Sequence, residues 1–302
     1  MNNILRPRHP LFALLMSLVL PGFGQLYNGE INRAIWLFLV FAIMTVPGVT
    51  LIALHLPSGW MMPCLIIALM LTVALWLFGM IDAWRGARRQ PDYVPQAWQV
   101  SGIYLLVLIL CDVIAFPLLT GYVRSHQVAS FRIPSSSMEP SVLKGDIIFA
   151  DKRYNCPGCK QEVKRGDIAI FTYPNNRTVY YIKRIIGLPG DQVQLRDHEI
   201  QVNGKSLKVS ETVTTSGALV FEADGDRHWQ VAWAVDEKHR PEADIAVPPG
   251  SVFVLGDNRT LSTDSRDFGT VPLQDVVGKA RQIWFSYGDN GVRWARLGKV
   301  LD

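Results

Sequence analysis

The stretch Pro134-Ser135-Ser136-Ser137-Met138-Glu139-Pro140-Ser141 begins just after the last long apolar segment of the chain, at the boundary between two regions of different composition. The chain has 302 residues and an apolar share of 49%. Residues 1–124 hold seven arginines, no lysine and four acidic residues, whereas residues 125–302 are polar and nearly neutral. This division predicts a membrane region at 1–124 and one polar domain of ordinary size at 125–302.

Three segments of the first region are long and apolar enough to cross a bilayer, which takes about 20 helical residues. They cover about 34–56, about 60–83 and about 101–123. A shorter apolar run, Leu11–Leu20, continues into Pro21-Gly22-Phe23-Gly24. Three alternatives stay open for this run, because it can span, enter and return, or lie in the interface. We therefore expect a membrane-anchored protein with three or four apolar helical segments before the polar domain.

Arginine positions predict the orientation of these segments. Arg85, Arg88 and Arg89 lie between the second and third long segments, so that loop is expected in the cytoplasm. The third segment then exits to the far side and carries residues 125–302 with it. Arginines also flank the short run at both ends, and if both ends stay inside, the short run does not cross.

The polar domain has the pattern of a mainly β structure. Short apolar runs are bounded by Gly, Pro, Asn and Asp, which is typical of strands separated by turns. The runs are Ile147–Ala150, Ile168–Phe171, Val179–Ile186, Val193–Leu195, Ile200–Val202 and Ser251–Leu255. Asn203-Gly204 is a strong signal for a tight hairpin turn. The stretch near 205–245 is polar, and we expect an irregular insertion or smaller subdomain there.

Serine and lysine residues carry the chemistry that this domain suggests. Lys183 lies on a predicted strand and shares one face with Tyr181 and Ile185, because alternate residues of a strand point the same way. An amine on an apolar face loses hydration, its pKa falls, and it can then act as a base near neutral pH. The alternative is a lysine on a solvated strand face. The Ser-rich stretch, Lys183 and the later block Gly256–Arg266 together indicate a membrane-tethered serine–lysine hydrolase.

These three blocks resemble those of bacterial-type signal peptidase I, the leader peptidase family of serine–lysine proteases. The resemblance covers about 131–191 and 248–287. It implies a barrel-like catalytic domain and a serine endopeptidase that removes N-terminal signal peptides from exported pre-proteins, cleaving after small residues. It also implies a reaction without a metal or organic cofactor. The apolar segments before residue 100 depart from the one or two anchors common in the family.

The resemblance also assigns roles to individual residues. The nucleophile of this family stands immediately before the methionine of the first block, which is Ser137 here. Lys183 matches the general base. The hydroxyl of Ser135 and the backbone N–H of Ser137 would form the oxyanion hole.

The third block is assigned by the same resemblance. Ser262 would orient the lysine amine by a hydrogen bond. Asp264 and Arg266 would form a supporting ion pair, and Asp257 and Asn258 would shape the turn beside the site. Taken by itself, this block is a polar loop with ordinary turn residues.

Cys156-Pro157-Gly158-Cys159 is a lone C-x-x-C sequence. A zinc site would need a second pair of ligands nearby, and none follows in a suitable pattern. A Cys156–Cys159 disulfide in an oxidising compartment and a turn with two free thiols stay equally open.

Apolar residues flank Ser137, and two interpretations of them stay open. They could form a surface that touches lipid, or they could be ordinary core residues. They are Phe131, Ile133, Met138, Val142 and Leu143.

The expected partners are pre-proteins bearing signal peptides and the lipid bilayer, with the protein export machinery as a further candidate. Nucleic acid is excluded as a partner because the polar domain is nearly neutral and so lacks the excess of Lys and Arg that binds phosphate backbones. We expect a multi-pass protein of the bacterial inner membrane with its catalytic domain outside the cytoplasm. The alternatives are a specialised peptidase with a narrow substrate set and an inactive protein that only binds substrates. A Ser-His-Asp triad is disfavoured because none of the six histidines lies in a motif block.

Overall fold

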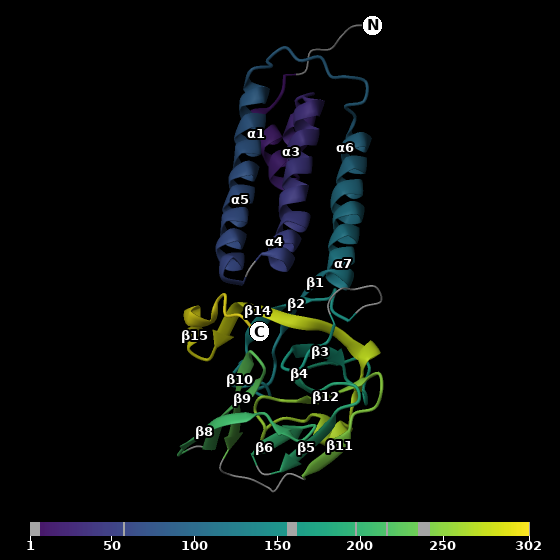
Figure 1. Cartoon of the computed structure of the whole chain (residues 1–302). Coiled ribbons are helices and arrows are strands. Elements are labelled where there is room, and N and C mark those ends of the chain that lie inside the picture. The colour runs from purple at the N-terminus through teal and green to yellow at the C-terminus, as the bar shows by residue number, and fades with distance from the viewer. Residues whose placement is uncertain are drawn as a thin grey trace. The chain divides into compact units, whose positions relative to one another are not determined.

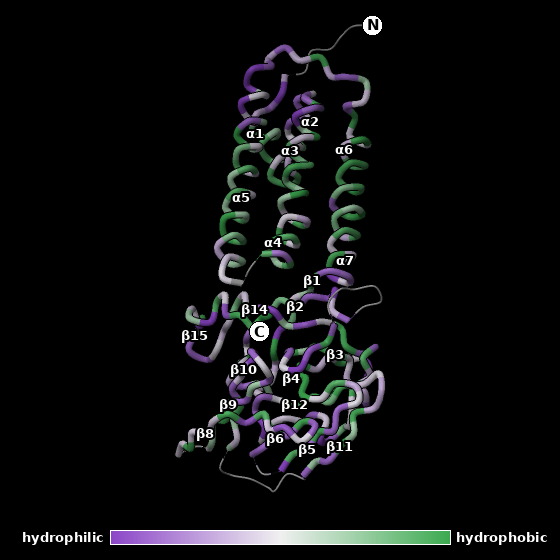
Figure 2. Tube along the Cα trace, viewed as in Figure 1, coloured by the Kyte–Doolittle hydropathy of each residue, from purple (hydrophilic) through white to green (hydrophobic). Residues whose placement is uncertain are grey.

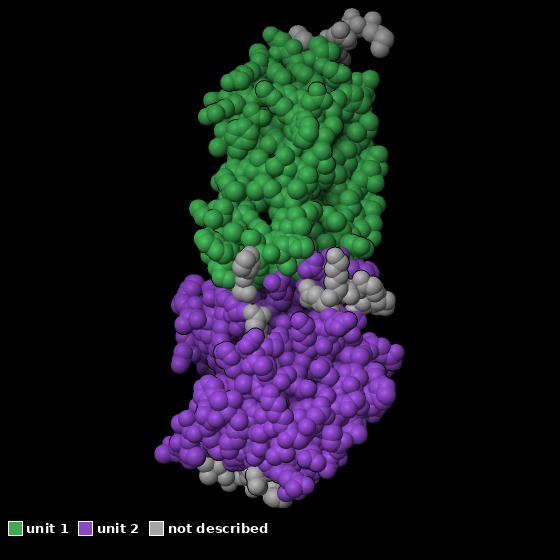
Figure 3. Space-filling model, in the orientation of Figure 1, with its two compact units in different colours: residues 1–125 green, residues 126–302 purple. Residues whose placement is uncertain are grey.

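The chain folds into two compact units, residues Met1–Ser125 and His126–Asp302, shown in green and purple in Figure 3. The computed structural model describes residues 7–56, 58–155, 162–196, 198–215, 217–234 and 242–301. Each unit has hydrophobic clusters of its own. The Cys156 and Cys159 pair, for which a disulfide or free thiols are expected, lies outside the described residues.

The first unit is helical (Figure 1). Three of its helices are long and apolar enough to cross a membrane, namely Ile31–His55, Gly59–Arg88 and Ser101–His126, and Figure 2 shows hydrophobic residues along them. The elements are α1 (Pro10–Val19), α2 (Phe23–Tyr27), α3 (Ile31–Ile43), a π-helical turn (Met44–Gly48), α4 (Val49–His55), α5 (Ser58–Arg88), α6 (Ser101–Leu108), a second π-helical turn (Ile109–Ala115) and α7 (Phe116–His126). The expected apolar helices are therefore present.

Helix α1 has only ten residues, which corresponds to about 15 Å at the rise of an α-helix. This is about half the thickness of a bilayer core. Polar side chains tie the segment after α1 to α5: the amide of Gln25 donates to the carbonyl of Gly79 at 2.8 Å, and the amide of Asn28 donates to the carbonyl of Ala83 at 2.8 Å. The chain thus turns back after α1 and is fastened there by buried hydrogen bonds.

The second unit is built on a large antiparallel sheet (Figure 1). The strand order is β1-β2-β14-β3-β4-β12-β13, and β15 pairs with β14. The bounds are β1 (Val128–Arg132), β2 (Asp146–Asp151), β3 (Ile168–Thr172), β4 (Tyr180–Gly187), β12 (Ser251–Leu255), β13 (Val271–Pro272), β14 (Val276–Gly288) and β15 (Gly291–Val292). Together with the apolar helices, this sheet confirms the expected fold class.

Two smaller antiparallel sheets complete the second unit. One has the order β11-β5-β6-β7 and the other the order β10-β9-β8. Their bounds are β5 (Gln192–Arg196), β6 (Glu199–Val202), β7 (Lys205–Ser206), β8 (Lys208–Thr214), β9 (Gly217–Asp224), β10 (Arg227–Ala234) and β11 (Ala243–Ala246). Short helical turns occur at α8 (Ser265–Phe268), Leu273–Asp275 and Trp294–Arg296.

The six apolar runs expected as strands are strands β2, β3, β4, β5, β6 and β12. The expected hairpin turn is also confirmed, because Val202 pairs with Lys205 across Asn203 and Gly204. Both turn residues have positive φ, 53° and 77°, as a two-residue hairpin turn of this kind requires.

The expectation of an irregular segment near 205–245 is wrong for its described part, since strands β8, β9 and β10 form a regular three-stranded sheet there. In β10, the buried residues Trp229, Val231 and Trp233 alternate with less buried ones. The residues between them are Gln230 and Ala232, and because alanine is apolar like its neighbours, the apolar and polar residues do not alternate strictly enough to mark the strand in the sequence.

The residues around the first motif block pack inward. Ile133, Met138 and Val142 are 3%, 0% and 0% exposed and belong to one core cluster with Ile148 and Ile283. The expectation that these three residues form a lipid-touching surface is therefore wrong, because their side chains fill the core beneath the loop. This packing fixes the loop that carries Ser137.

Candidate active site

Residues 133–145 connect β1 to β2 and carry Ser137. The base of this loop is closed by two backbone hydrogen bonds, from Gly145 N to the carbonyl of Ile133 and from Ile133 N to the carbonyl of Asp146, each at 2.9 Å. Within the loop, Val142 N donates to the carbonyl of Met138 at 2.9 Å. Because the side chains after Ser137 are anchored in the core, the hydroxyl of Ser137 is held at the core's edge, with 9% of the residue exposed.

Lys183 lies on β4, which is hydrogen-bonded to β3 on one side and to β12 on the other. It stands opposite Ala169 of β3 and is 3% exposed. Its Nζ donates a hydrogen bond of 2.7 Å to Oγ of Ser137, and it lies 5.6 Å from the ring centre of Tyr181. The fold thus brings together two residues of separate motif blocks in a setting with little water.

Burial lowers the pKa of Lys183 to about 8 from its usual 10.5. The negative charges of Asp264 and Asp257 act in the opposite direction, and the positive charge of Arg266 adds to the lowering. Desolvation exceeds these charge effects because the ammonium form loses most of its hydration. A lysine with this pKa has an appreciable neutral fraction near pH 7 and can accept a proton from a hydroxyl.

Ser135 lies beside Ser137 in the same loop. Its hydroxyl is hydrogen-bonded to that of Ser137 at 3.3 Å, and the residue is exposed. A hydroxyl at this position can donate to a negative oxygen that develops next to Ser137.

The third motif block packs against the loop that carries Ser137. A Cβ added at Gly256 would lie 2.1 Å from Oγ of Ser262 and 2.5 Å from the carbonyl oxygen of Ser137. Only glycine leaves room for both neighbours, since real Cβ contacts are never this short. Ser262 is fully buried. Its hydroxyl contributes to lowering the pKa of Asp264.

Asp264 and Arg266 form a buried ion pair. Arg266 donates from Nε to Oδ1 and from Nη2 to Oδ2 of Asp264, each at 2.8 Å. Gly256 N donates to the same carboxylate at 3.0 Å. Burial by itself raises the pKa of Asp264, but the hydrogen bond and charge of Arg266 outweigh it and hold this pKa below its usual range. The carboxylate therefore stays charged and fixes the turn that contains Gly256.

Sequence reasoning missed the role of Arg184. Its guanidinium donates to Asp257 from Nε at 2.8 Å and from Nη2 at 2.6 Å, and both residues are almost fully buried. It also donates to the carbonyl of Gly166 at 2.7 Å and to the hydroxyl of Ser141 at 3.1 Å. The available signal was an arginine inside the apolar run 182–186, because a buried guanidinium needs a carboxylate partner.

A second missed pair joins the site to the neighbouring sheet. Arg259 donates from Nη1 and Nη2 to the two carboxylate oxygens of Glu222, each at 2.6 Å, and both residues are fully buried. Between these anchors, Asn258 donates from its backbone N to the carbonyl of Ser137 at 3.1 Å and from its side chain to the carbonyl of Ser136 at 3.3 Å. The turn at 256–259 therefore holds the backbone of Ser137 directly.

Within the described ranges, no group of three or more His, Cys, Asp or Glu side chains is arranged to hold a metal ion.

Residues 104–285 match the family model described as signal peptidase, peptidase S26. The match covers more than half of the chain and includes every site residue discussed above. The chain belongs to the signal peptidase S26 family. The helices α1 to α5 precede the matched residues, so this member of the signal peptidase family carries a further helical segment ahead of the shared part.

Curated relatives agree with this membership. A signal peptidase I of Rickettsia typhi is 36% identical over 52% of this chain and 71% of the relative. That of Buchnera aphidicola is 30% identical over 59% of this chain and 76% of the relative, and that of Pseudomonas aeruginosa is 33% identical over 59% and 73%. A solved signal peptidase I structure from Enterococcus faecalis is 34% identical, covers 39% of this chain and 97% of that chain, and has a TM-score of 0.29.

Proposed function

We propose that this chain is a membrane-bound serine endopeptidase that removes N-terminal signal peptides from exported pre-proteins, with Ser137 as nucleophile and Lys183 as general base. Membership of the signal peptidase family supports the reaction. The 2.7 Å hydrogen bond between Lys183 Nζ and Ser137 Oγ, in a site where the lysine is 3% exposed, carries the assignment of the two residues.

The reaction follows from this geometry. The neutral amine of Lys183 takes the hydroxyl proton while Oγ of Ser137 bonds to the scissile carbonyl carbon, and the carbonyl oxygen becomes negative. The hydroxyl of Ser135 and the N–H of Ser137 would donate to this oxygen. The ammonium then returns the proton to the leaving amine, which departs as the C–N bond breaks. Water attacks the carbonyl carbon of the resulting ester and gives a proton to Lys183. The bond between this carbon and Oγ of Ser137 then breaks, the cleaved signal peptide leaves with a new carboxyl group, and the ammonium returns its proton to Oγ.

The supporting residues hold the Ser137 hydroxyl and the Lys183 amine close to each other. Asn258 holds the Ser137 backbone, and the Asp264–Arg266 pair fixes the turn around Gly256. We assign Ser262 to orienting the lysine amine. These residues would hold Ser137 and Lys183 in place, and none of them exchanges a proton in the proposed reaction.

The proposed location is the bacterial inner membrane, crossed several times, with the domain at 125–302 outside the cytoplasm. The arginines at 85, 88 and 89 support a cytoplasmic loop after α5. Signal-peptide-bearing pre-proteins and lipid are the partners, and the export machinery is a further proposed one. Protease added to intact spheroplasts should digest the catalytic domain, whereas protection until the membrane is opened would contradict this orientation.

The decisive experiment is cleavage of one model pre-protein by the purified full chain in detergent. Ser137→Ala and Lys183→Met should each reduce cleavage to background while the protein stays folded. The matched controls are Ser136→Ala, in the same loop, and Lys164→Met, an exposed lysine of the same unit; both should cleave normally. Near-normal cleavage by either active-site variant would refute the assignment.

The same assay separates the alternatives. A wild-type protein that binds pre-proteins without cleaving any would be an inactive binding protein. A panel of unrelated pre-proteins then distinguishes general from dedicated processing, because a specialised enzyme would cleave only one or a few of them.

A further inference from the structure

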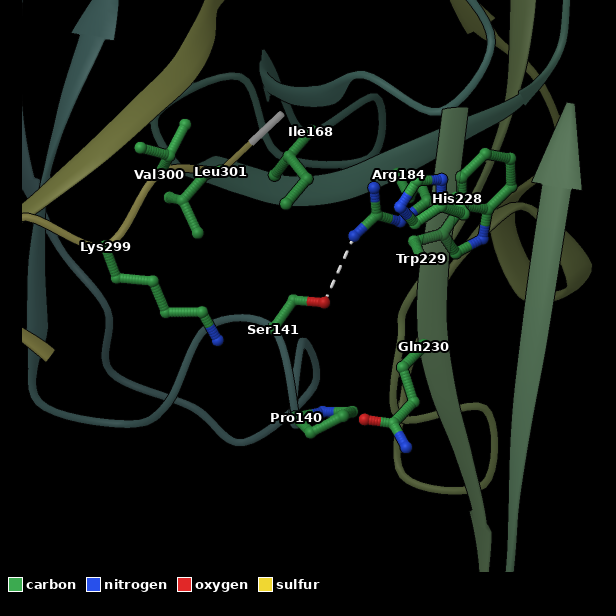
Figure 4. Close-up of a pocket in the computed structure, with 10 residues that line it drawn as sticks. All are labelled: Pro140, Ser141, Ile168, Arg184, His228, Trp229, Gln230, Lys299, Val300 and Leu301. Carbon is green, nitrogen blue, oxygen red and sulfur yellow. Dashed lines mark hydrogen bonds between the residues drawn. The ribbon is translucent and has the colours of Figure 1, made fainter. Parts of the chain in front are cut away.

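A cavity of about 180 Å³ lies in the second unit, apart from the candidate active site. It is lined by Arg184 and by Ile168, which stand opposite each other on β4 and β3. Because neighbouring strand residues point to opposite faces, this cavity lies on the other side of the sheet from Lys183. Figure 4 shows residues 299–301 on one side of it and residues 228–230 of β10 on the other.

The polar groups that line the cavity are hydrogen-bond donors. The ammonium of Lys299 reaches into it toward Ser141 (Figure 4) and has no hydrogen bond or ion pair within the described part of the chain. The hydroxyl of Ser141 accepts from Arg184 at 3.1 Å, which leaves its own hydrogen to donate. The amide of Gln230 also lines the cavity, and no Asp or Glu is among the described lining residues.

The charges around the cavity do not cancel. Two carboxylates are close enough to act on Lys299, Asp146 and Asp257. Each is already held by an arginine: Arg296 binds Asp146 at 2.6 Å, and Arg184 binds Asp257 at 2.6 Å. One positive charge is left over, on Lys299. Lys299 is exposed as a residue, and partial desolvation and the charge of Arg296 lower its pKa, whereas the charges of Asp146 and Asp257 act in the opposite direction.

We propose that this cavity binds a small phosphate-type anion, either inorganic phosphate or a phosphate monoester, through Lys299, Ser141 and Gln230. A phosphate group offers acceptor oxygens in several directions, which suits donors that converge from separate elements. The bound anion would join the chain at 299–301 to Pro140 and Ser141. Since these two residues follow the nucleophile in the same loop, occupancy would stiffen the loop without touching Ser137.

Binding can be tested on the full chain in dodecyl maltoside, a detergent without phosphate. Inorganic phosphate is titrated by calorimetry, and chloride at equal ionic strength controls for screening. Lys299→Met should weaken phosphate binding at least tenfold, which corresponds to about 1.4 kcal/mol. Lys299→Arg should retain binding, and Lys205→Met, an exposed lysine on β7, should bind like the wild type. Unfolding temperatures measured without phosphate show whether each variant is folded.

Two results would overturn the proposal. One is a wild-type protein that shows no saturable phosphate binding beyond the effect of chloride. The other is a folded Lys299→Met variant that binds phosphate with the wild-type Kd. Dihexanoyl phosphatidic acid, added in place of phosphate, shows whether the bound phosphate group belongs to a lipid or to a free anion. Stronger binding of the lipid than of phosphate assigns the site to a lipid headgroup, and equal or weaker binding assigns it to a free anion. None of these measurements depends on peptidase activity.

Discussion

Replacing Lys183 by methionine should abolish cleavage and, at neutral pH, stabilise the catalytic unit. The buried lysine has a pKa of about 8 in the folded protein against 10.5 for an exposed lysine. Since each tenfold change in proton affinity is worth about 1.36 kcal/mol, burying the ammonium costs about 3 kcal/mol of the free energy of unfolding at pH 7. Methionine fills similar space without a charge. Its loss of the hydrogen bond to Ser137 costs about 1 kcal/mol, so the net gain is about 2 kcal/mol.

The stability difference between Lys183→Met and the wild type should depend on pH. The folded pKa of Lys183 lies below the unfolded one, so the unfolded chain binds the extra proton between about pH 8 and pH 10.5. The penalty is therefore complete below about pH 8, shrinks as the pH rises through this window and is absent above it. The advantage of Lys183→Met should fall accordingly and reverse slightly once the wild-type amine is neutral in both states.

Denaturant unfolding in one detergent, at several pH values, measures this difference. Ser137→Ala is the matched control, because this variant is also expected to be inactive but keeps the lysine. Comparing the two inactive variants excludes a gain in stability that comes only from the loss of self-digestion. Lys183→Met should be more stable than Ser137→Ala at pH 7 and lose that lead as the pH rises. A variant that is no more stable at pH 7, or a lead that does not change with pH, would refute the reasoning.

Three further predictions follow from the site. The acidic limb of the kcat/KM profile should report an apparent pKa of about 8 for Lys183; a rate that keeps rising to about pH 10 would show a lysine at its ordinary pKa. Gly256→Ala should lower kcat at least tenfold with the protein still in the membrane, because its Cβ would lie 2.1 Å from the Ser262 hydroxyl, and full activity would contradict the close packing. Arg184→Met should lower the free energy of unfolding by about 3–5 kcal/mol, since it leaves the Asp257 carboxylate buried and unpaired. Adding Asp257→Asn should recover part of this loss. If the double variant unfolds as easily as the single variant, the pairing argument is refuted.

Features that depend on local pattern could be read from the sequence. Helices of the first unit follow from runs of apolar residues, because a bilayer imposes a minimum length and a composition that any window of the chain reveals. The turn at Asn203-Gly204 follows from the few residues that tolerate positive φ. Strands such as β3 and β12 follow from short apolar runs between turn residues.

Strands whose two faces differ were harder to recognise. Strand β8 is almost wholly exposed, and in β9 and β10 the buried faces include polar or aromatic residues such as Glu222 and Trp229, so the sheet lacks a simple apolar stripe. Strand β14, 13 residues long, joins β2 and β3 at the centre of the large sheet, but its burial pattern is broken at Gln282 and Ile283, which are both buried, and its register with β2 shifts there. Strand β14 is regular because it pairs with β2 and β3, which lie more than 100 positions earlier in the chain, and local composition carries no record of that pairing.

For the site, the sequence predicted Ser137 and Lys183 as the reacting pair, their order along the chain and which face of its strand Lys183 occupies. It did not predict the Arg184–Asp257 and Arg259–Glu222 pairs. Only the tertiary structure decided that Lys183 Nζ meets Ser137 Oγ across 46 positions of sequence, that Gly256 packs between Ser262 and the nucleophile's backbone, and that Arg184 takes Asp257 as its partner. The physical reason is that a lysine's pKa depends on how much water and charge surround it. The strands, loops and ion pairs that exclude that water come from segments far apart in the chain.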